Sequence, residues 1–334
     1  MKNMRVAING FGRIGRYTLK MMLKKDGMDI VAINDLTDTK TLAHLFKYDS
    51  IHGKFDGEVS YDATSLIING KVIPVFSQKD PAQLPWASLN VDVVVESTGL
   101  FRTHDKASAH ITAGAKRVII SSPADSDDVK SVVLGVNEHI LDGSETVISN
   151  ASCTTNNAAP MIKIVEELCD AQSGFITTVH SYTSDQRLHD SPHKDLRRAR
   201  AAAENIIPTS TGAAKAITKI FPDLDGLIGG AGIRVPVKNG SVTDITLIVK
   251  NPKSVEEINA AFKKASENEL KGILEYTEDP IVSSDIIGNP HSCIYDAELT
   301  TVIGNMVKVV GWYDNEAGYS NRLVDLIQYL SKFN

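Results

Sequence analysis

Apolar residues in the first third of the chain occur in short runs that alternate with stretches of helical spacing. We predict strands at residues 4–8, 29–33, 91–96 and 117–120, and a helix at 14–24. The strand runs are continuously apolar, which is typical of strands buried on both faces of a parallel sheet. The β–α–β–α order therefore predicts an α/β domain with a doubly wound Rossmann sheet.

The pattern changes near residue 150. Residues 240–250 alternate between apolar and polar side chains, as in an antiparallel strand with one covered face. Further strands are predicted at 174–182 and 301–313, and helices at 158–168, 255–266 and 320–333. We therefore expect a Rossmann domain at 1–152, followed by an α+β domain with a mainly antiparallel sheet at 153–316.

Gly10, Gly12 and Gly15 form a G-x-G-x-x-G run that follows the first predicted strand and opens the first helix. In this context glycines permit a tight turn and let the backbone approach a pyrophosphate, which the helix N-terminus binds. Asp35 lies 20 residues past Gly15, at the end of the second strand. A carboxylate there accepts hydrogen bonds from ribose hydroxyls and repels a 2′-phosphate, which favours NAD over NADP. The alternative is a plain strand–helix turn with a loop acid at position 35.

Composition limits the possible classes of protein. The chain is 42% hydrophobic and 23% charged, as globular proteins are. No apolar run approaches the ~20 residues of a membrane span, and no secretory signal is apparent. A net charge of −6 gives no reason to expect nucleic acid as a partner. Three cysteines in 334 residues make no disulfide framework, which fits a reducing, cytoplasmic location.

Cys153 lies between a predicted strand and a predicted helix, at or just before the helix N-terminus. Free N–H groups and the helix dipole at such a place can lower a cysteine pKa from about 8.5 to between roughly 3.5 and 7.5. Two interpretations are open: a nucleophile, or a buried structural cysteine. The neighbouring residues argue against an apolar pocket, since they are polar: Asn150, Ser152, Thr154, Thr155 and Asn156.

His180 ends a predicted strand 27 residues after Cys153. A strand-end histidine beside a thiol can take its proton and later act as a general base. The chain has nine histidines, however, and spacing alone favours a surface or hydrogen-bonded histidine at this position. The catalytic role of His180 therefore stays open at this point.

Three later segments could bind anions. Residues 185–200 carry four arginines and a lysine, which indicates either a solvated face or an electropositive wall for phosphate ligands. Within them, Ser191-Pro192 predicts an extended loop before a short helix. Residues 208–212 place hydroxyls before a helix that opens at residue 213, which is a second possible anion site. Arg234 lies between apolar residues, and its burial would need a paired anion. No H-E-x-x-H or paired C-x-x-C is present, so no metal site is predicted.

Several segments together give the chain a close resemblance to phosphorylating glyceraldehyde-3-phosphate dehydrogenases. The resemblance extends from the first strand to within about twenty residues of the C-terminus, so it covers the whole chain. The segments that carry it are residues 7–16 (AINGFGRIGR), 47–50 (KYDS), 149–156 (SNASCTTN), 193–200 (HKDLRRAR), 208–215 (PTSTGAAK) and 312–316 (WYDNE).

The resemblance implies an NAD-dependent enzyme that oxidises and phosphorylates glyceraldehyde 3-phosphate through a cysteine thioester. It implies a homotetramer, and a C-terminal helix (317–334) that completes the Rossmann domain. Cys153 would be the nucleophile and His180 the base. The residues implied to bind the substrate phosphate or inorganic phosphate are Ser152, Thr154, Thr183, Arg198, Thr211, Gly212 and Arg234. Those implied to bind NAD are Gly10, Gly12, Arg13, Ile14, Gly15, Asp35, Ser121 and Asn315.

Three positions depart from the family pattern. Asn157 stands where many relatives carry a second cysteine, which changes the expected redox behaviour of Cys153. Ala317 replaces a usual tryptophan, and Ser191 replaces a bulkier apolar residue that helps to exclude a 2′-phosphate. Two other functions are considered: an erythrose-4-phosphate dehydrogenase, which hydrolyses its acyl-enzyme, and a non-catalytic binding protein. The intact residues 209–212 favour inorganic phosphate as the attacking group.

Overall fold

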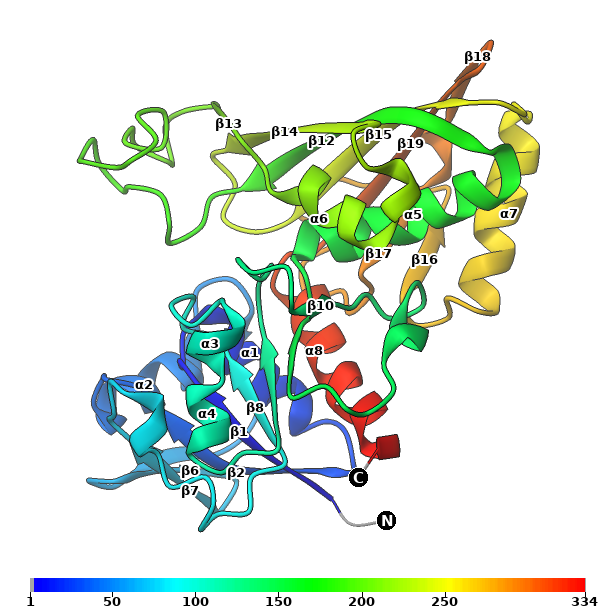
Figure 1. Ribbon diagram of the computed structural model, residues 1–334. Helices are drawn as coiled ribbons and strands as arrows, with labels where there is room; N and C mark the ends of the chain where they lie inside the picture. The colour runs from blue at the N-terminus through cyan, green and yellow to red at the C-terminus, as the bar shows by residue number, and fades with distance from the viewer. Residues whose placement is uncertain (1–2, 334) are drawn as a thin grey trace. The chain divides into compact units, whose positions relative to one another are not determined.

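The computed structural model describes residues 3–333, and the chain forms two compact units (Figure 1). Unit 1 contains residues 3–132, 138–151 and 320–333. Unit 2 contains residues 133–137 and 152–319. The C-terminal residues therefore belong to the same unit as the first strand.

Unit 1 is built around a nine-stranded sheet. In chain order its strands are β1 (Met4–Asn9), β2 (Met28–Asn34), β5 (Val59–Tyr61), β6 (Ser65–Ile68), β7 (Lys71–Phe76), β8 (Val93–Glu96), β9 (Arg117–Ile120), β10 (Lys130–Ser131) and β11 (Val147–Ser149). The helices are α1 (Arg13–Met22), α2 (Thr39–Lys47), α3 (His104–Ala107), α4 (Ala109–Thr112) and most of α8 (Ala317–Leu330). Strands β3 (Tyr48–Asp49) and β4 (Gly53–Lys54) form a separate hairpin.

The strand order places a ligand crevice at the end of β1. The order is β10-β11-β9-β8-β1-β2-β7-β6-β5, and every pair from β10 to β7 is parallel. The chain leaves β1 toward β2 on one side and later returns to β8 on the other, which is the switch point of a doubly wound sheet. Val93, Val94 and Val95 of β8 are fully buried, as a covered parallel strand requires. The predicted Rossmann sheet is confirmed.

Unit 2 contains an eight-stranded sheet. Its strands are β12 (Ala171–Ser181), β13 (Ile207–Thr209), β14 (Ile228–Val235), β15 (Ser241–Val249), β16 (Leu274–Thr277), β17 (Cys293–Asp296), β18 (Thr301–Ile303) and β19 (Met306–Tyr313). Helices α5 (Cys153–Cys169), α6 (Ala213–Ile220) and α7 (Val255–Glu267) pack against it (Figure 1).

The sheet of unit 2 is mainly antiparallel, as predicted. Its order is β13-β14-β12-β15-β19-β17-β16, with β18 against β19, and only the β12–β14 and β16–β17 pairs are parallel. Every second residue of β15 is buried, because one face of this strand is covered. The predicted capping box of α7 is present, with Ser254 and Glu257 each bonded to the other's backbone N–H.

Two predictions of local structure are wrong. The expected strand at 301–313 is divided into β18 and β19, which form a hairpin around Gly304, where φ is +60°. The short helix expected after Ser191-Pro192 does not form, and residues 182–206 contain no helix. In that loop the charged side chains bind local partners: Arg187 donates to the Pro192 carbonyl, and Arg200 pairs with Asp190.

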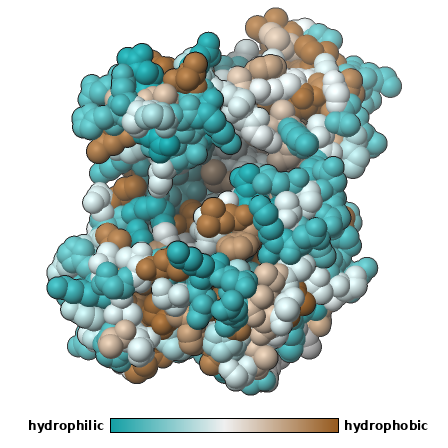
Figure 2. Space-filling model, turned by 60° about the vertical axis from the view of Figure 1, so that its left-hand side comes forward, coloured by the Kyte–Doolittle hydropathy of each residue, from teal (hydrophilic) through white to brown (hydrophobic). Residues whose placement is uncertain are grey.

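On the face shown in Figure 2, hydrophilic side chains predominate and hydrophobic groups are scattered among them. The loop between β12 and β13 (residues 182–206) carries several exposed apolar side chains. Its Leu188, Leu196 and Ile206 are 78%, 81% and 70% exposed. Among residues 3–333, no helix combines the length and the apolarity that a bilayer crossing requires.

Candidate active site

The glycine turn after β1 has the geometry of a dinucleotide-binding turn. Gly10 has a φ of +91°, and a Cβ there would lie 2.7 Å from the backbone nitrogen of Thr98. A Cβ on Gly15 would lie 2.2 Å from the Gly10 carbonyl oxygen, so this glycine permits close packing of α1. Gly12, at the N-cap of α1, has no atom within 4 Å of its Cβ position. The space beside Gly12, at the N-terminus of α1, fits a bound pyrophosphate.

Alanine substitutions should separate the roles of two of these glycines. We expect Gly15→Ala to lower the Tm of the free protein by roughly 4 °C or more, because its Cβ would collide with backbone. Gly12→Ala is expected to keep the Tm and to weaken NAD binding about tenfold or more, because its methyl group fills the pyrophosphate space. Thermal unfolding and calorimetric titration with NAD measure the two effects. An unchanged NAD affinity in G12A would contradict a pyrophosphate at this position.

Asp35 stands beside the glycine turn. Its Oδ2 accepts a hydrogen bond from the N–H of Phe11 at 2.7 Å, and its Oδ1 accepts one from the N–H of Thr37 at 2.9 Å. The side chain is half-buried. The parallel pairing of β1 with β2 thus brings the predicted carboxylate to the predicted turn.

The other cofactor candidates of unit 1 have different surroundings. Ile14 is half-buried in the first turn of α1, and Ser121 follows β9. Arg13 forms an ion pair with Asp49, with Nη1 at 3.0 Å from Oδ1. Burial opposes ionisation of Asp49, but the backbone N–H groups of residues 51 and 52, together with Arg13, lower its pKa to about 2. Arg13 is therefore held by a carboxylate that is ionised at neutral pH.

In unit 2, Cys153 is the first residue of α5, and its thiol faces His180. The N-cap residue Ser152 accepts a hydrogen bond from the Thr155 N–H through its Oγ at 3.0 Å. The Cys153 Sγ lies 3.5 Å from the His180 Nε2. Cys153 is partly exposed, whereas His180 is buried. The fold therefore brings the two predicted catalytic groups into contact.

The expected effect on the Cys153 thiol is corrected by the structure. Burial raises the pKa of Cys153, while the charge of Arg234 and the N–H group of Thr154 act in the opposite direction. The sequence prediction of a lowered pKa considered only the helix N-terminus, and desolvation of the sulfur outweighs it. A thiolate at this position therefore depends on a nearby group that accepts its proton.

His180 has the position and the protonation state of such a group. With its hydrogen on Nδ1, His180 donates to the Ser181 carbonyl at 2.7 Å and leaves Nε2 unprotonated toward Cys153; with its hydrogen on Nε2, Nδ1 can instead accept from Arg234. Arg234 Nη1 donates to the same carbonyl at 2.7 Å and lies 2.6 Å from Nδ1. Burial and the charge of Arg234 lower the pKa of His180 to about 3. The imidazole is therefore neutral at physiological pH while the thiol keeps its proton.

The two arginines predicted to bind phosphate lie in different surroundings. Arg198 Nε donates to the Thr209 Oγ1 at 2.9 Å, and Arg198 also contacts Asp185. This places the guanidinium next to the strand that leads into Thr211 and Gly212 at the start of α6. The other arginine, Arg234, is half-buried beside His180.

Two predicted phosphate ligands have other partners as well. The Thr154 hydroxyl is bonded to the Tyr313 hydroxyl at 2.9 Å. Thr183 is half-buried, and its N–H donates to the Oε1 of Gln186 at 3.4 Å. The Nε2 of Gln186 is buried without a hydrogen-bond partner among the described residues. The structure thus adds a buried donor to the loop that carries Thr183.

Asn315, predicted to bind the cofactor, is held in one orientation within unit 2. Its Oδ1 accepts hydrogen bonds from the Gly240 N–H at 3.2 Å and from the hydroxyls of Ser181 and Ser241 at 2.9 Å each. Because a backbone N–H can only donate, Oδ1 must be the atom on this side. The amide nitrogen is left as a fixed donor, which suits recognition of a carbonyl group.

Sequence reasoning missed Tyr313. Its hydroxyl bonds to Thr154 and to Thr178, each at 2.9 Å, and its ring meets His180 edge-on at a centroid distance of 5.9 Å. It therefore connects the first turn of α5 with the strand that carries the histidine. Tyr313 precedes Asp314 and Asn315 in a quoted family segment, but nothing in its local pattern points toward a thiol.

The three family departures lie in different surroundings, and the buried Oδ1 of Asn157 has no hydrogen-bond partner among residues 3–333. Asn157 is fully buried on α5, and its Nδ2 donates to the Trp312 carbonyl at 3.2 Å. Ala317 is fully buried at the start of α8, and Ser191 is exposed. Among residues 3–333, no group of three or more His, Cys, Asp or Glu side chains is arranged to hold a metal ion.

The fold and site define a class: a Rossmann-type, dinucleotide-binding unit joined to a unit in which a cysteine at a helix start contacts a buried histidine. Sequence comparison makes the assignment specific. Residues 4–104 match the family model for the NAD binding domain of glyceraldehyde 3-phosphate dehydrogenase, and residues 152–315 match that of its C-terminal domain. The chain belongs to the glyceraldehyde-3-phosphate dehydrogenase family.

Curated relatives align over nearly the whole chain. Glyceraldehyde-3-phosphate dehydrogenase of Thermotoga maritima is 57% identical over 331 residues, which cover 98% of this chain and 99% of the relative. The enzyme of Mycobacterium avium is 56% identical over 335 residues, and glyceraldehyde-3-phosphate dehydrogenase 2 of Streptomyces avermitilis is 55% identical over 329. Each of these two alignments covers 98% of both chains.

Proposed function

We propose that the protein is an NAD-dependent, phosphorylating glyceraldehyde-3-phosphate dehydrogenase. The observation that carries this proposal is the Cys153 thiol at the start of α5, 3.5 Å from the His180 Nε2 and within the field of the Arg234 charge. Unit 1 would be the NAD-binding domain, with limits at 1–152 and 317–334, and unit 2 the catalytic domain at 153–316. These limits differ from the compact units by a few residues.

The first half-reaction follows from the pair of side chains. Cys153 passes its proton to His180 Nε2, and the resulting thiolate adds to the aldehyde carbon. The imidazolium returns this proton to the new alkoxide oxygen, which gives a hemithioacetal and a neutral His180. His180 then accepts the proton of the hemithioacetal hydroxyl as that carbon is oxidised to a thioester. NAD, when bound, supplies the hydride acceptor. Arg234 and Thr183 would hold the substrate phosphate and so fix the aldehyde near the sulfur.

The second half-reaction requires an anion site. Inorganic phosphate attacks the thioester carbonyl, and the C–S bond breaks to give an acyl phosphate and the Cys153 thiolate. Phosphate must outcompete water, so a dedicated site is needed. We propose that this site is formed by Ser152, Thr154, Arg198, Thr211 and Gly212.

The predicted cofactor residues are proposed as contacts of NAD. We propose that Gly10, Gly12, Arg13, Ile14 and Gly15 bind the pyrophosphate side, with Ser121 as a further contact. Asp35 would accept the ribose hydroxyls and select NAD over NADP. The free amide nitrogen of Asn315 would donate to the nicotinamide carboxamide.

A homotetramer is proposed from the family. The exposed Leu188, Leu196 and Ile206 on one loop support an interface between copies of the chain. A reducing, cytoplasmic location is proposed because all three cysteines are unpaired.

A steady-state assay tests this function. We expect NADH formation from glyceraldehyde 3-phosphate with NAD, strictly dependent on inorganic phosphate and much slower with NADP. Product analysis should find acyl phosphate. A phosphate-independent rate that gives a free acid would favour an erythrose-4-phosphate dehydrogenase type of reaction, and no turnover would favour a binding protein.

A further inference from the structure

A buried polar network connects the carboxyl ends of three strands in unit 1. Asn9 ends β1, Asn34 ends β2 and Glu96 ends β8, and these residues are 1%, 4% and 2% exposed. Asn9 and Asn34 directly precede Gly10 and Asp35 of the candidate cofactor site. Glu96 precedes Ser97, whose hydroxyl bonds to the Gly10 carbonyl of the glycine turn. The proposed mechanism uses none of the three network residues.

The orientation of both asparagines is fixed from one end of the network. The backbone N–H of Gln78 donates to the Asn34 Oδ1 at 2.8 Å, and the Gln78 carbonyl accepts from the Asn34 Nδ2 at 2.9 Å. The Asn34 amide can therefore sit in only one way. Its Nδ2 also donates to the Asn9 Oδ1 at 2.7 Å, so it is the Asn9 Nδ2 that donates to Glu96 Oε2.

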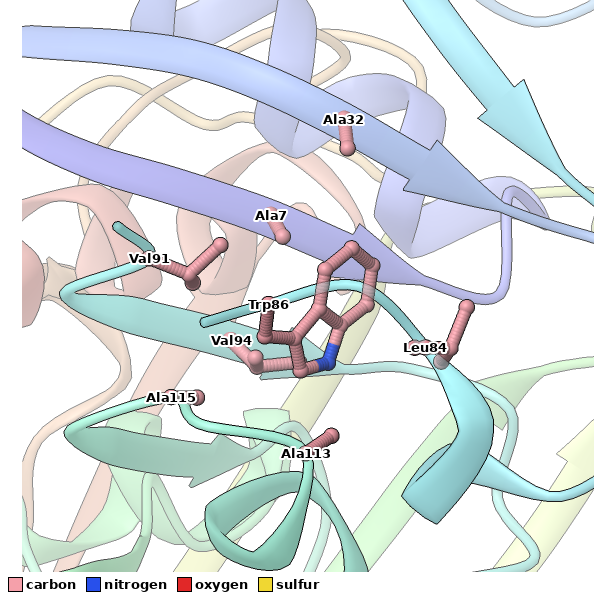
Figure 3. Close-up of a cluster of buried hydrophobic side chains, with 8 residues drawn as sticks. All are labelled: Ala7, Ala32, Leu84, Trp86, Val91, Val94, Ala113 and Ala115. Carbon is pink, nitrogen blue, oxygen red and sulfur yellow. The ribbon is translucent and has the colours of Figure 1, made fainter. Parts of the chain in front are cut away.

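The protonation of His110 is fixed from the other end. The indole N–H of Trp86 can only donate, and it lies 3.0 Å from the His110 Nδ1. Trp86 is packed among small buried residues, with its nitrogen on the side away from Ala7 and Ala32 (Figure 3). Nδ1 must therefore be an acceptor, the imidazole is neutral, and its hydrogen is on Nε2. That Nε2 donates to Glu96 Oε2 at 3.1 Å.

Thr98 supplies two more donors to the same carboxylate. Its N–H donates to Glu96 Oε1 at 2.8 Å, and its hydroxyl donates to the same oxygen. Four neutral donors thus converge on the two oxygens of Glu96, two on each. These hydrogen bonds hold the buried side chain in one orientation.

We propose that Glu96 is a positioning residue for the cofactor turn. By holding Asn9 and Thr98, the Glu96 carboxyl group fixes the backbone on both sides of Gly10. Contact with the turn is direct, because a Cβ on Gly10 would lie 2.7 Å from the Thr98 nitrogen, and the Ser97 hydroxyl donates to the Gly10 carbonyl at 2.6 Å. A turn fixed before binding costs less to order, which raises affinity. This inference rests on the proposed binding of NAD.

The test is the substitution Glu96→Gln with NAD affinity measured by calorimetry. An amide has one acceptor oxygen, so two of the four donors would face hydrogens of the new side chain. We expect the Kd for NAD to rise about tenfold or more. The KM for glyceraldehyde 3-phosphate should stay within about twofold, because unit 2 is unchanged.

A matched variant controls for lost stability. Val118→Ala removes volume from a separate buried cluster on β9 and should lower the Tm without touching the network. It should keep the wild-type Kd for NAD. Should E96Q fail to fold, Asn9→Ser cuts the same network at another bond and is expected to raise the Kd as well. A Kd within about twofold of wild type in E96Q, or an equal loss of affinity in V118A, would overturn the proposal.

A double variant separates positioning from general damage. In E96Q, the His110 Nε2 could accept a hydrogen bond from the new amide only if its own hydrogen moved to Nδ1, where Trp86 donates. Trp86→Phe removes that donor, so the double variant E96Q/W86F should bind NAD more tightly than E96Q alone. A double variant that binds NAD no better than E96Q would overturn the donor arrangement. Wild-type protein that binds no NAD would instead refute the proposed function itself.

Discussion

Replacing Cys153 with serine is expected to abolish dehydrogenase activity, with a fall in kcat of about 10⁴-fold or more. A serine hydroxyl ionises far less readily than a thiol, and the neutral His180 can draw little alkoxide from it. The alcohol ester it would form is also less reactive toward phosphate than a thioester. Initial rates of NADH formation with glyceraldehyde 3-phosphate and phosphate measure the effect.

Cys169→Ser is the matched control. Cys169 is on the same helix, at its last position, and is fully buried. Loss of a thiol there should leave kcat within a few fold of wild type, although it lowers stability. If C153S kept more than about 1% of the wild-type rate, Cys153 could not be the nucleophile.

The second large effect is expected for His180→Asn. Loss of the base should lower kcat by about 10²- to 10⁴-fold. The pH dependence of Cys153 should change as well. Burial raises the pKa of the thiol, and without His180 its proton has no acceptor at 3.5 Å. The thiolate fraction at neutral pH therefore falls, and the loss diminishes as the pH rises above the raised pKa.

Alkylation of Cys153 by iodoacetamide measures this shift. We expect the rate-against-pH profile of H180N to move to higher pH, and the profile of His139→Asn, an exposed control, to match wild type. An unchanged alkylation profile in H180N would mean that the histidine does not take the thiol proton. The apparent pKa values describe the pair rather than either residue alone.

The predictions of local structure succeeded where a few neighbouring residues constrain the backbone conformation by themselves. A glycine pattern between a strand and a helix constrains the turn by itself, so Gly10 and Gly15 are recognisable before any contact is known. Cys153 was placed at a helix start for the same reason. The hairpin at Gly304 and the loop after Ser191 were mispredicted. Apolar runs and charge runs do not specify which distant strands or side chains the segment will bind.

The sequence by itself determined the doubly wound sheet, the cofactor turn, the acid at position 35 and the helix start that bears the thiol. These follow from periodicity and from backbone conformations that only certain residues adopt. Only the tertiary structure decided that Cys153 meets His180, since that contact needs α5 to pack against β12, and the pairing of β12 with β14 then adds Arg234. It also decided the sign of the Cys153 pKa shift and the donors around Glu96, because desolvation and buried hydrogen bonds arise from residues far apart in the chain.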